Sequence, residues 1–84
     1  MSNFREQIYN TISEQLGVEK EKITPEALFA DDLNAGEIEM EELHTNLQKK
    51  LKIEIDPLKS KEAATVEELV NIIFNKLNGL VDEE

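Results

Sequence analysis

Residues 29–51 read FADDLNAGEIEMEELHTNLQKKL, and this stretch decides the fold. Its second half carries apolar residues along one edge at helical spacing: Ile38, Met40, Leu43, Leu47 and Leu51. Residues three or four apart lie on the same face of an α-helix. We therefore expect a helix over residues 37–51 that turns this apolar edge toward a core.

Charge is distributed unevenly in and around this helix. Seven acidic residues and no basic one lie between Glu26 and Glu42, whereas five lysines and two acids lie between Lys49 and Lys61. The helix dipole favours acids in the first turn and lysines in the last, which explains the signs along the helix itself. It does not explain the acids before the helix or the lysines after it.

The N-terminal part of the chain predicts one helix followed by a long loop. The helix spans about residues 3–16, with an apolar residue at every fourth position and a stop at Gly17: Phe4, Ile8, Ile12 and Leu16. Residues 17–36 form the loop, which stays ordered only if its apolar side chains enter a core. We expect four side chains to do so: Ile23, Leu28, Phe29 and Leu33.

Two more helices are predicted in the C-terminal part of the chain. Asp56 followed by proline is a favourable helix start and opens a short helix over about residues 57–62. Thr65-Val-Glu-Glu68 forms a capping box and opens a helix over about residues 65–78. The glycine that follows is expected to end this helix, so that residues 79–84 form a solvated tail.

Composition limits the classes of function. The 84 residues suffice for one small domain, and the absence of cysteine excludes disulfides and thiolate chemistry. A net charge of −10 argues against nucleic acid and anionic membrane surfaces as partners, because phosphate would be repelled. No apolar run is long enough to span a membrane and no signal peptide is recognisable, so we expect a cytoplasmic protein.

Catalytic and metal-binding residues are not evident in the sequence. His44 is the single histidine, and it is expected to be a surface residue on the flank of its helix rather than a general base. An EF-hand loop beginning at Asp31 would have its glycine and its last glutamate in place. Leu33 and Ala35, however, occupy positions three and five, where an EF-hand needs side-chain oxygens. We therefore expect neither an enzyme nor a metal protein.

Several short motifs along the chain together resemble the acyl carrier protein family. In order they are Leu16-Gly17-Val18, Phe29-Ala-Asp-Asp32-Leu33, Glu42-Leu43, Ile53-Glu-Ile55 and Thr65-Val66. The resemblance implies an all-α bundle of three main helices and one short helix, with the first loop packed across it. It covers nearly the whole chain.

The resemblance fails at the attachment residue of the family. Acyl carrier proteins open their second helix with Asp-Ser-Leu, whose serine carries phosphopantetheine, and this chain has Gly36-Glu37-Ile38 there. A carboxylate is not the hydroxyl nucleophile that takes up the arm, so we expect phosphopantetheine to be absent. Other hydroxyl residues lie too far from the start of the second helix to replace the serine: Ser2, Ser13, Ser60 and, two turns into that helix, Thr45.

The resemblance also implies a protein partner that contacts the second helix. The family presents apolar residues where this chain has Glu41 and Thr45, and we expect Met40 to compensate. Family enzymes present a basic patch, which the lysines of this chain would repel, so the partner should differ from those enzymes. The predicted contact residues lie at both ends of the helix: Asp32, Glu37, Glu39, Glu41, Glu42, Lys49, Lys50 and Lys52.

The resulting hypothesis is a monomeric, non-catalytic module for protein interaction or regulation. Glu37 either mimics the phosphodiester of a loaded carrier or is simply a favourable helix-start residue. Three alternatives remain. The chain is a working acyl or aminoacyl carrier of fatty-acid or polyketide-type biosynthesis with its arm attached elsewhere, a non-covalent lipid binder, or an unrelated small helical adaptor.

Overall fold

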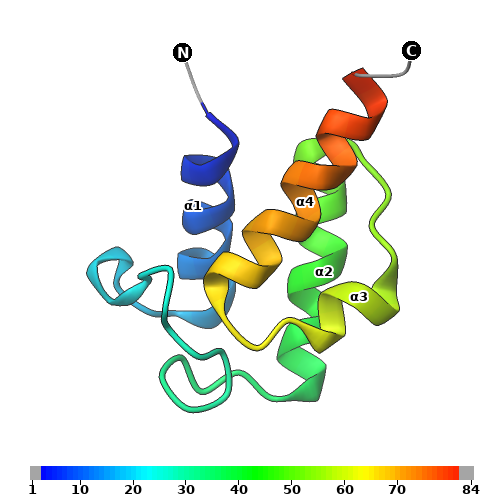
Figure 1. Cartoon of the computed structure of the whole chain (residues 1–84). Helices are drawn as coiled ribbons and strands as arrows, with labels where there is room; N and C mark the ends of the chain where they lie inside the picture. The colour runs from blue at the N-terminus through cyan, green and yellow to red at the C-terminus, as the bar shows by residue number, and fades with distance from the viewer. Residues whose placement is uncertain (1–2, 82–84) are drawn as a thin grey trace.

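The computed structural model describes residues 3–81, which form a bundle of α-helices (Figure 1). Its elements are α1 (Phe4–Leu16), the 3-10 turn η1 (Lys20–Lys22), α2 (Glu37–Leu51), α3 (Pro57–Glu62) and α4 (Val66–Val81). Within the described residues the only extended pairing is an isolated bridge between Leu28 and Thr65. The prediction of three main helices and one short one is confirmed.

The ends of α1 follow from local chemistry. The side chain of Asn3 accepts a hydrogen bond from the backbone N–H of Glu6 at 2.6 Å, which satisfies one free donor of the first turn. At the other end Gly17 has φ +68°, a left-handed conformation that costs least for glycine. Its N–H donates to the carbonyl of Ser13 and closes the helix.

Polar side chains also set the starts of α3 and α4. Asp56 accepts from the N–H of Leu58 at 3.0 Å, as expected for the residue before a proline-led helix. Thr65 Oγ1 accepts from the N–H of Glu68 at 3.1 Å, and the Glu68 carboxylate accepts from the N–H of Ala64 at 2.7 Å. The two residues of the predicted capping box thus cap α4, but the carboxylate of Glu68 accepts from the N–H of Ala64 and not from that of Thr65.

The expected end of α4 is wrong. Gly79 does not terminate the helix, which continues to Val81. Glycine inside a helix costs only about 1 kcal/mol relative to alanine, so glycine in the last turn does not by itself break a helix. The tail predicted from residue 79 onward is therefore helical for residues 79–81, and its last three residues lie outside the described ones.

The core consists of apolar side chains from α1, α2 and α4 together with the first loop. Its largest fully buried members are Ile8, Ile12, Leu33, Leu43, Leu47, Val66, Leu69 and Ile73. Two residues of the predicted stripes are exposed instead, Phe4 by 41% and Ile38 by 67%. Phe4 is the first residue of α1 and lies at the end of that helix, where solvent reaches its side chain. Ile38 lies five residues before Leu43, a rotation of about 140° around the helix, and so leaves the buried edge.

The first loop is tied to the start of α4. The N–H of Phe29 donates to the carbonyl of Ala64, and the N–H of Val66 donates to the carbonyl of Ala27, each at 3.0 Å. Because this backbone is extended, neighbouring side chains alternate in direction. Phe29 and Ala27 are buried, as are the predicted core residues Ile23 and Leu33.

Leu28 was expected in the core but is 37% exposed, since it lies between two inward-facing neighbours in the extended segment. The rest of the loop closes over the end of the bundle. Ala35 is also buried there, although its small side chain gave no indication of this in the sequence.

Arg5 connects the start of α1 to the first turn of α4. Its two terminal nitrogens lie 3.0 and 3.4 Å from the carboxylate oxygens of Glu67. These hydrogen bonds, with a further one to Tyr9, raise the pKa of the guanidinium above its usual range. The pairing is bidentate, which fixes the direction of approach of the two helices more closely than a single contact would.

Replacing Leu43 or Leu47 by alanine should lower the free energy of unfolding by about 2–5 kcal/mol, because both side chains are fully buried in α2. Urea denaturation followed by circular dichroism measures the loss. Ile38→Ala is the matched control on the same helix and should change stability little, because Ile38 is exposed. Equal stability of the leucine variants and the wild type would contradict the register of α2.

Candidate functional site

The start of α2 is capped from within the helix. Gly36 precedes the first turn and has no side chain to accept a hydrogen bond. The Glu39 carboxylate instead accepts from the N–H of Gly36 at 2.9 Å, and the Gly36 carbonyl accepts from the N–H of Met40 at 3.0 Å. Glu39, one of the predicted partner-binding residues, is therefore engaged in capping its own helix.

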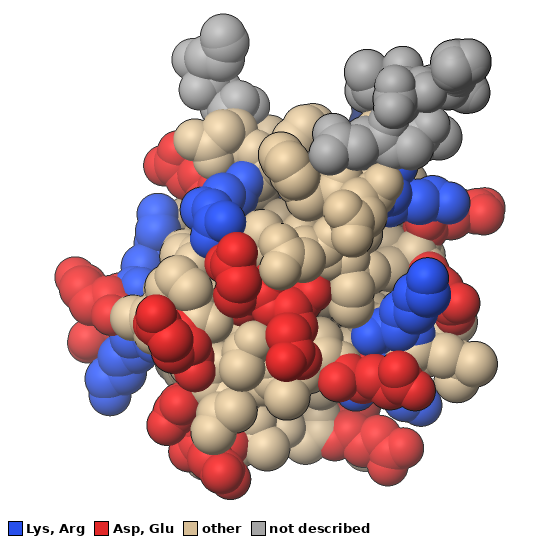
Figure 2. All heavy atoms as spheres, in the orientation of Figure 1, with Lys and Arg blue, Asp and Glu red and all other residues tan. Residues whose placement is uncertain are grey.

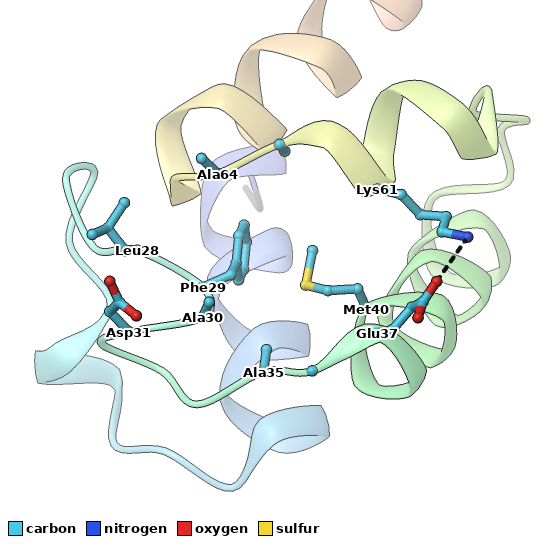
Figure 3. A pocket seen from close by; sticks show the side chains of 11 residues that line it. Leu28, Phe29, Ala30, Asp31, Ala35, Glu37, Met40, Lys61 and Ala64 are labelled. Carbon is cyan, nitrogen blue, oxygen red and sulfur yellow. Dashed lines mark ion pairs between the residues drawn. The ribbon is translucent and has the colours of Figure 1, made fainter.

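Glu37 is the first residue of α2, and its side chain is 78% exposed. Lys61 of α3 reaches toward it, with 3.8 Å between the lysine Nζ and a carboxylate oxygen (Figure 3). The same Nζ lies 3.5 Å from the carboxylate of Glu41, one helical turn further along. A lysine from the lysine-rich segment thus lies against the acidic start of α2.

The other predicted acids have partners within the domain. Asp32 accepts from the N–H of Leu28 at 2.8 Å and closes a turn of the first loop. Glu42 accepts from the side-chain amide of Gln15 at 3.2 Å and joins α2 to α1. Both residues remain exposed, so their charges still contribute to the surface potential.

The predicted lysines lie at the far end of α2. Lys50 pairs with Glu14 of α1 at 3.5 Å. Lys49 and Lys52 are exposed and make no ion pair with the described residues. Twelve residues separate Glu37 from Lys49, which is about 18 Å along the helix axis. The predicted contact residues therefore form two patches and not one continuous site.

The space-filling view agrees with this uneven distribution of charge (Figure 2). Acidic side chains lie along the lower part of this face, where Figure 1 shows the first loop and the start of α2, and also at its centre and sides. Basic side chains lie mainly at its two sides.

An open hollow of about 470 Å³ lies beside Glu37, between the first loop, the start of α2 and the link from α3 to α4 (Figure 3). Phe29 and Met40 project into it, and small side chains such as Ala35 and Ala63 complete its lining. Met40 is only 9% exposed. Its side chain faces the hollow, so any apolar contact that Met40 offers a partner would be made there, and the expectation that it compensates for Glu41 and Thr45 stays a prediction.

His44 is half-buried, not the surface residue that was expected. Its Nδ1 lies 2.7 Å from the hydroxyl oxygen of Ser60, which joins α2 to α3. A serine beside a histidine can act as a nucleophile, but Ser60 is only 2% exposed and also bonds to the carbonyl of Pro57 at 3.3 Å. The pair holds α3 in place and offers no access to a substrate.

Two other kinds of site are absent from the described part of the chain. No helix there is long and apolar enough to cross a membrane. No group of three or more histidine, cysteine, aspartate or glutamate side chains is arranged there to hold a metal ion. The start of α2, with Lys61 and the adjoining hollow, is therefore the arrangement we take as the candidate functional site.

Lys61 is the site residue that the sequence did not identify. The sequence did indicate that residues 57–62 lie close to α2. A short helix that follows a longer one after a brief link is expected to pack back along it. The antiparallel return is visible in two contacts, from Ser60 to His44 and from Lys61 to Glu37. Which face of so short a helix would meet α2 was not determined by its sequence.

Glu39→Ala should destabilise the domain by about 1 kcal/mol more than Glu37→Ala, although each removes one carboxylate from the same helix turn. Only the Glu39 variant leaves the N–H of Gly36 without its partner. Parallel thermal melts at one pH and ionic strength compare the two. Indistinguishable melting temperatures would show that the cap contributes nothing beyond the helix-dipole effect shared by both residues.

Comparison with known proteins finds a relative that matches nearly the whole chain. No protein-family model matches the chain. The chain is 34% identical over 76 residues to the protein named acyl carrier protein from Thermosynechococcus vestitus. The match covers 90% of this chain and 94% of that relative, so it includes α2 and the site at its start. On this similarity, and with the helical bundle described above, the chain belongs to the acyl carrier protein family.

Proposed function

We propose that this member of the acyl carrier protein family is not loaded with phosphopantetheine at the start of α2, and that it acts as a non-catalytic module for protein interaction or regulation. The observation that carries the proposal is Glu37, an exposed carboxylate at the first position of α2. Attachment of the arm to a serine gives a stable phosphodiester. A carboxylate in its place would give a mixed anhydride, which water cleaves.

Three hydroxyl groups elsewhere in the bundle are engaged in hydrogen bonds within the domain, which supports the proposal. Ser60 is buried against His44. Thr45 lies two turns along α2 and donates to the carbonyl of Glu41 at 3.1 Å. Ser13, at the end of α1, donates to the carbonyl of Val18 at 2.6 Å. None of these three groups is a free hydroxyl at the start of α2, so a modifying enzyme that approaches there would meet the exposed carboxylate of Glu37.

The exposed side chains of α2 support a protein partner. Ile38 is 67% exposed and lies next to Glu37, so an apolar contact is available beside the acidic one. Carboxylates around an apolar residue favour a partner of basic and apolar character, and they influence the rate of encounter and the choice of partner more than the affinity. Nucleic acid and anionic membranes fit poorly, since the net charge is −10.

A non-covalent lipid binder is the second candidate function. The hollow beside Glu37 favours it, because Phe29 and Met40 give it an apolar lining. Its opening on the surface argues against deep sequestration of an acyl chain. A lipid that stays with the purified protein under native mass spectrometry would favour this candidate over the interaction module.

The wild type should show no change of intact mass after incubation with coenzyme A and a promiscuous phosphopantetheinyl transferase, whereas a Gly36→Asp/Glu37→Ser/Ile38→Leu variant should gain one phosphopantetheine group. Gly36 has φ −89°, which other residues adopt, and a Cβ there would meet only the flexible Glu39 carboxylate, at 2.9 Å. An established carrier protein serves as positive control. A gain of mass by the wild type would refute the proposal.

Glu41→Lys/Glu42→Lys should abolish capture of the partner from a lysate of the host, because both carboxylates are exposed on α2, and the domain should remain folded. Pull-down with mass-spectrometric identification measures capture, and circular dichroism monitors folding. Glu19→Lys/Glu21→Lys makes the same change of charge at exposed residues beside α1 and should leave capture intact. Normal capture by the α2 variant would show that its face is not the contact surface.

A further inference from the structure

A separate hollow of about 290 Å³ lies between α3 and α4, near the link that leads from α2 to α3 (Figure 1). Its lining includes Ile55 and Ile72, together with Lys59 of α3 and Lys76 of α4. Ile55 is buried and Ile72 is half-buried, whereas both lysines are exposed. The hollow thus combines an apolar floor with a basic rim.

The two lysines of this rim have no acidic partner. Neither Lys59 nor Lys76 forms an ion pair within the described part of the chain. Asp56 lines the same hollow, but its carboxylate accepts from the N–H of Leu58 at 3.0 Å and caps α3 instead. Two lysines against one aspartate leave the lining with an excess of positive charge, in a chain whose net charge is −10.

This local charge acts in spite of the net charge of the chain. At physiological ionic strength, exposed charges more than about 8 Å apart are largely screened from one another. A single carboxylate that enters the hollow therefore meets the two ammonium groups at close range, and distant acids contribute little. A broad anionic surface would meet those acids as well, so the hollow favours a narrow acidic ligand.

A second hollow, of about 330 Å³, continues the first along α3 and α4, because Lys59 and Ile72 line both. Asn71 lines the second hollow and Asn75 the first, one helical turn apart on α4. Neither side-chain amide has a hydrogen-bond partner among the described residues. An amide offers a donor and an acceptor, as each peptide group does, so the pair of asparagines fits the backbone of a protein segment. The tail of a fatty acid has no groups that could use them.

We propose that the groove formed by these two hollows binds a short acidic segment of a partner protein, with a carboxylate between Lys59 and Lys76 and an apolar side chain on the floor. This surface goes beyond the proposed function, which places the partner on α2. Glu62 and Glu68 line the other end of the groove and repel a carboxylate there. The segment therefore lies in one direction, with its acid toward Lys76.

The test is a titration of isotopically labelled protein with N-acetyl-Leu-Ala-Glu amide at physiological ionic strength, followed by backbone amide shifts. In an extended tripeptide the first and third side chains point the same way, so leucine and glutamate can enter the groove together. Lys59→Gln/Lys76→Gln should bind at least about threefold more weakly than the wild type, as expected for the loss of two exposed ion pairs.

Lys20→Gln/Lys22→Gln is the matched control. It removes the same charge from two exposed lysines of η1 that form no ion pair with the described residues, and it should bind the peptide as the wild type does. Circular dichroism checks that both variants remain folded.

The chemistry of the occupant is tested by changing the peptide and the asparagines. N-acetyl-Gly-Ala-Glu amide should bind more weakly than the leucyl peptide, and N-acetyl-Leu-Ala-Gln amide should not bind measurably. Asn71→Ala/Asn75→Ala should also weaken binding of the leucyl peptide. The shifts produced by this peptide should centre on residues 55–59 and 71–76.

Equal affinities of the wild type and Lys59→Gln/Lys76→Gln, or shifts centred on the start of α2, would overturn the proposal. Shifts at the groove with octanoate but not with the peptide would overturn it in favour of a lipid ligand. Shifts there on raising the protein concentration, without peptide, would assign the groove to a second copy of the chain. The charge reversal at Glu41 and Glu42 changes a different surface, so either experiment can fail while the other succeeds.

Discussion

Burial of Leu43 and Leu47 is the interaction on which the rest of the structure depends, because it sets the rotation of α2 about its axis. With those two side chains inside, successive residues of the first turns are directed outward or inward by geometry alone. Glu37 and Glu41 face solvent, and Met40 points into the hollow. A rotation of α2 by one residue would exchange these roles and would place a carboxylate in the core, at a high cost in free energy.

The short helix α3 depends on α2 in a different way. With six residues it is too short to be stable alone, and its contacts with α2 include buried and exposed polar groups. The bond between Ser60 and His44 is shielded, whereas the ion pairs of Lys61 are open to water. The helix is thus fixed by the first contact, and the second can exchange partners without releasing it. The exposed groups around Lys61 can therefore change their binding partners while α3 stays packed on α2.

Much of this fold was predictable because its determinants are local. Helix starts follow from Asn3, Asp56 and Thr65, and the buried edge of α2 follows from its spacing. The errors arose where tertiary context decides. Leu28 is turned outward by the extended segment around it, and Gly79 lies within a helix that continues past it. At the site, the acids were identified but Lys61 was not, because the packing of α3 on α2 is a relation between segments that neither one encodes alone.

The cap at the start of α2 has an evolutionary consequence. Because the Glu39 side chain satisfies the N–H of Gly36, the helix does not need an aspartate or a serine at its entrance in order to form. The start of α2 therefore forms without any contribution from the side chain at position 37 to its cap. Substitutions at the attachment position are free to accumulate without loss of the bundle, and selection can keep the scaffold for its contacts after the chemistry has gone. A helix start of this kind leaves the residue at the first position of α2 open to change at little cost to the fold.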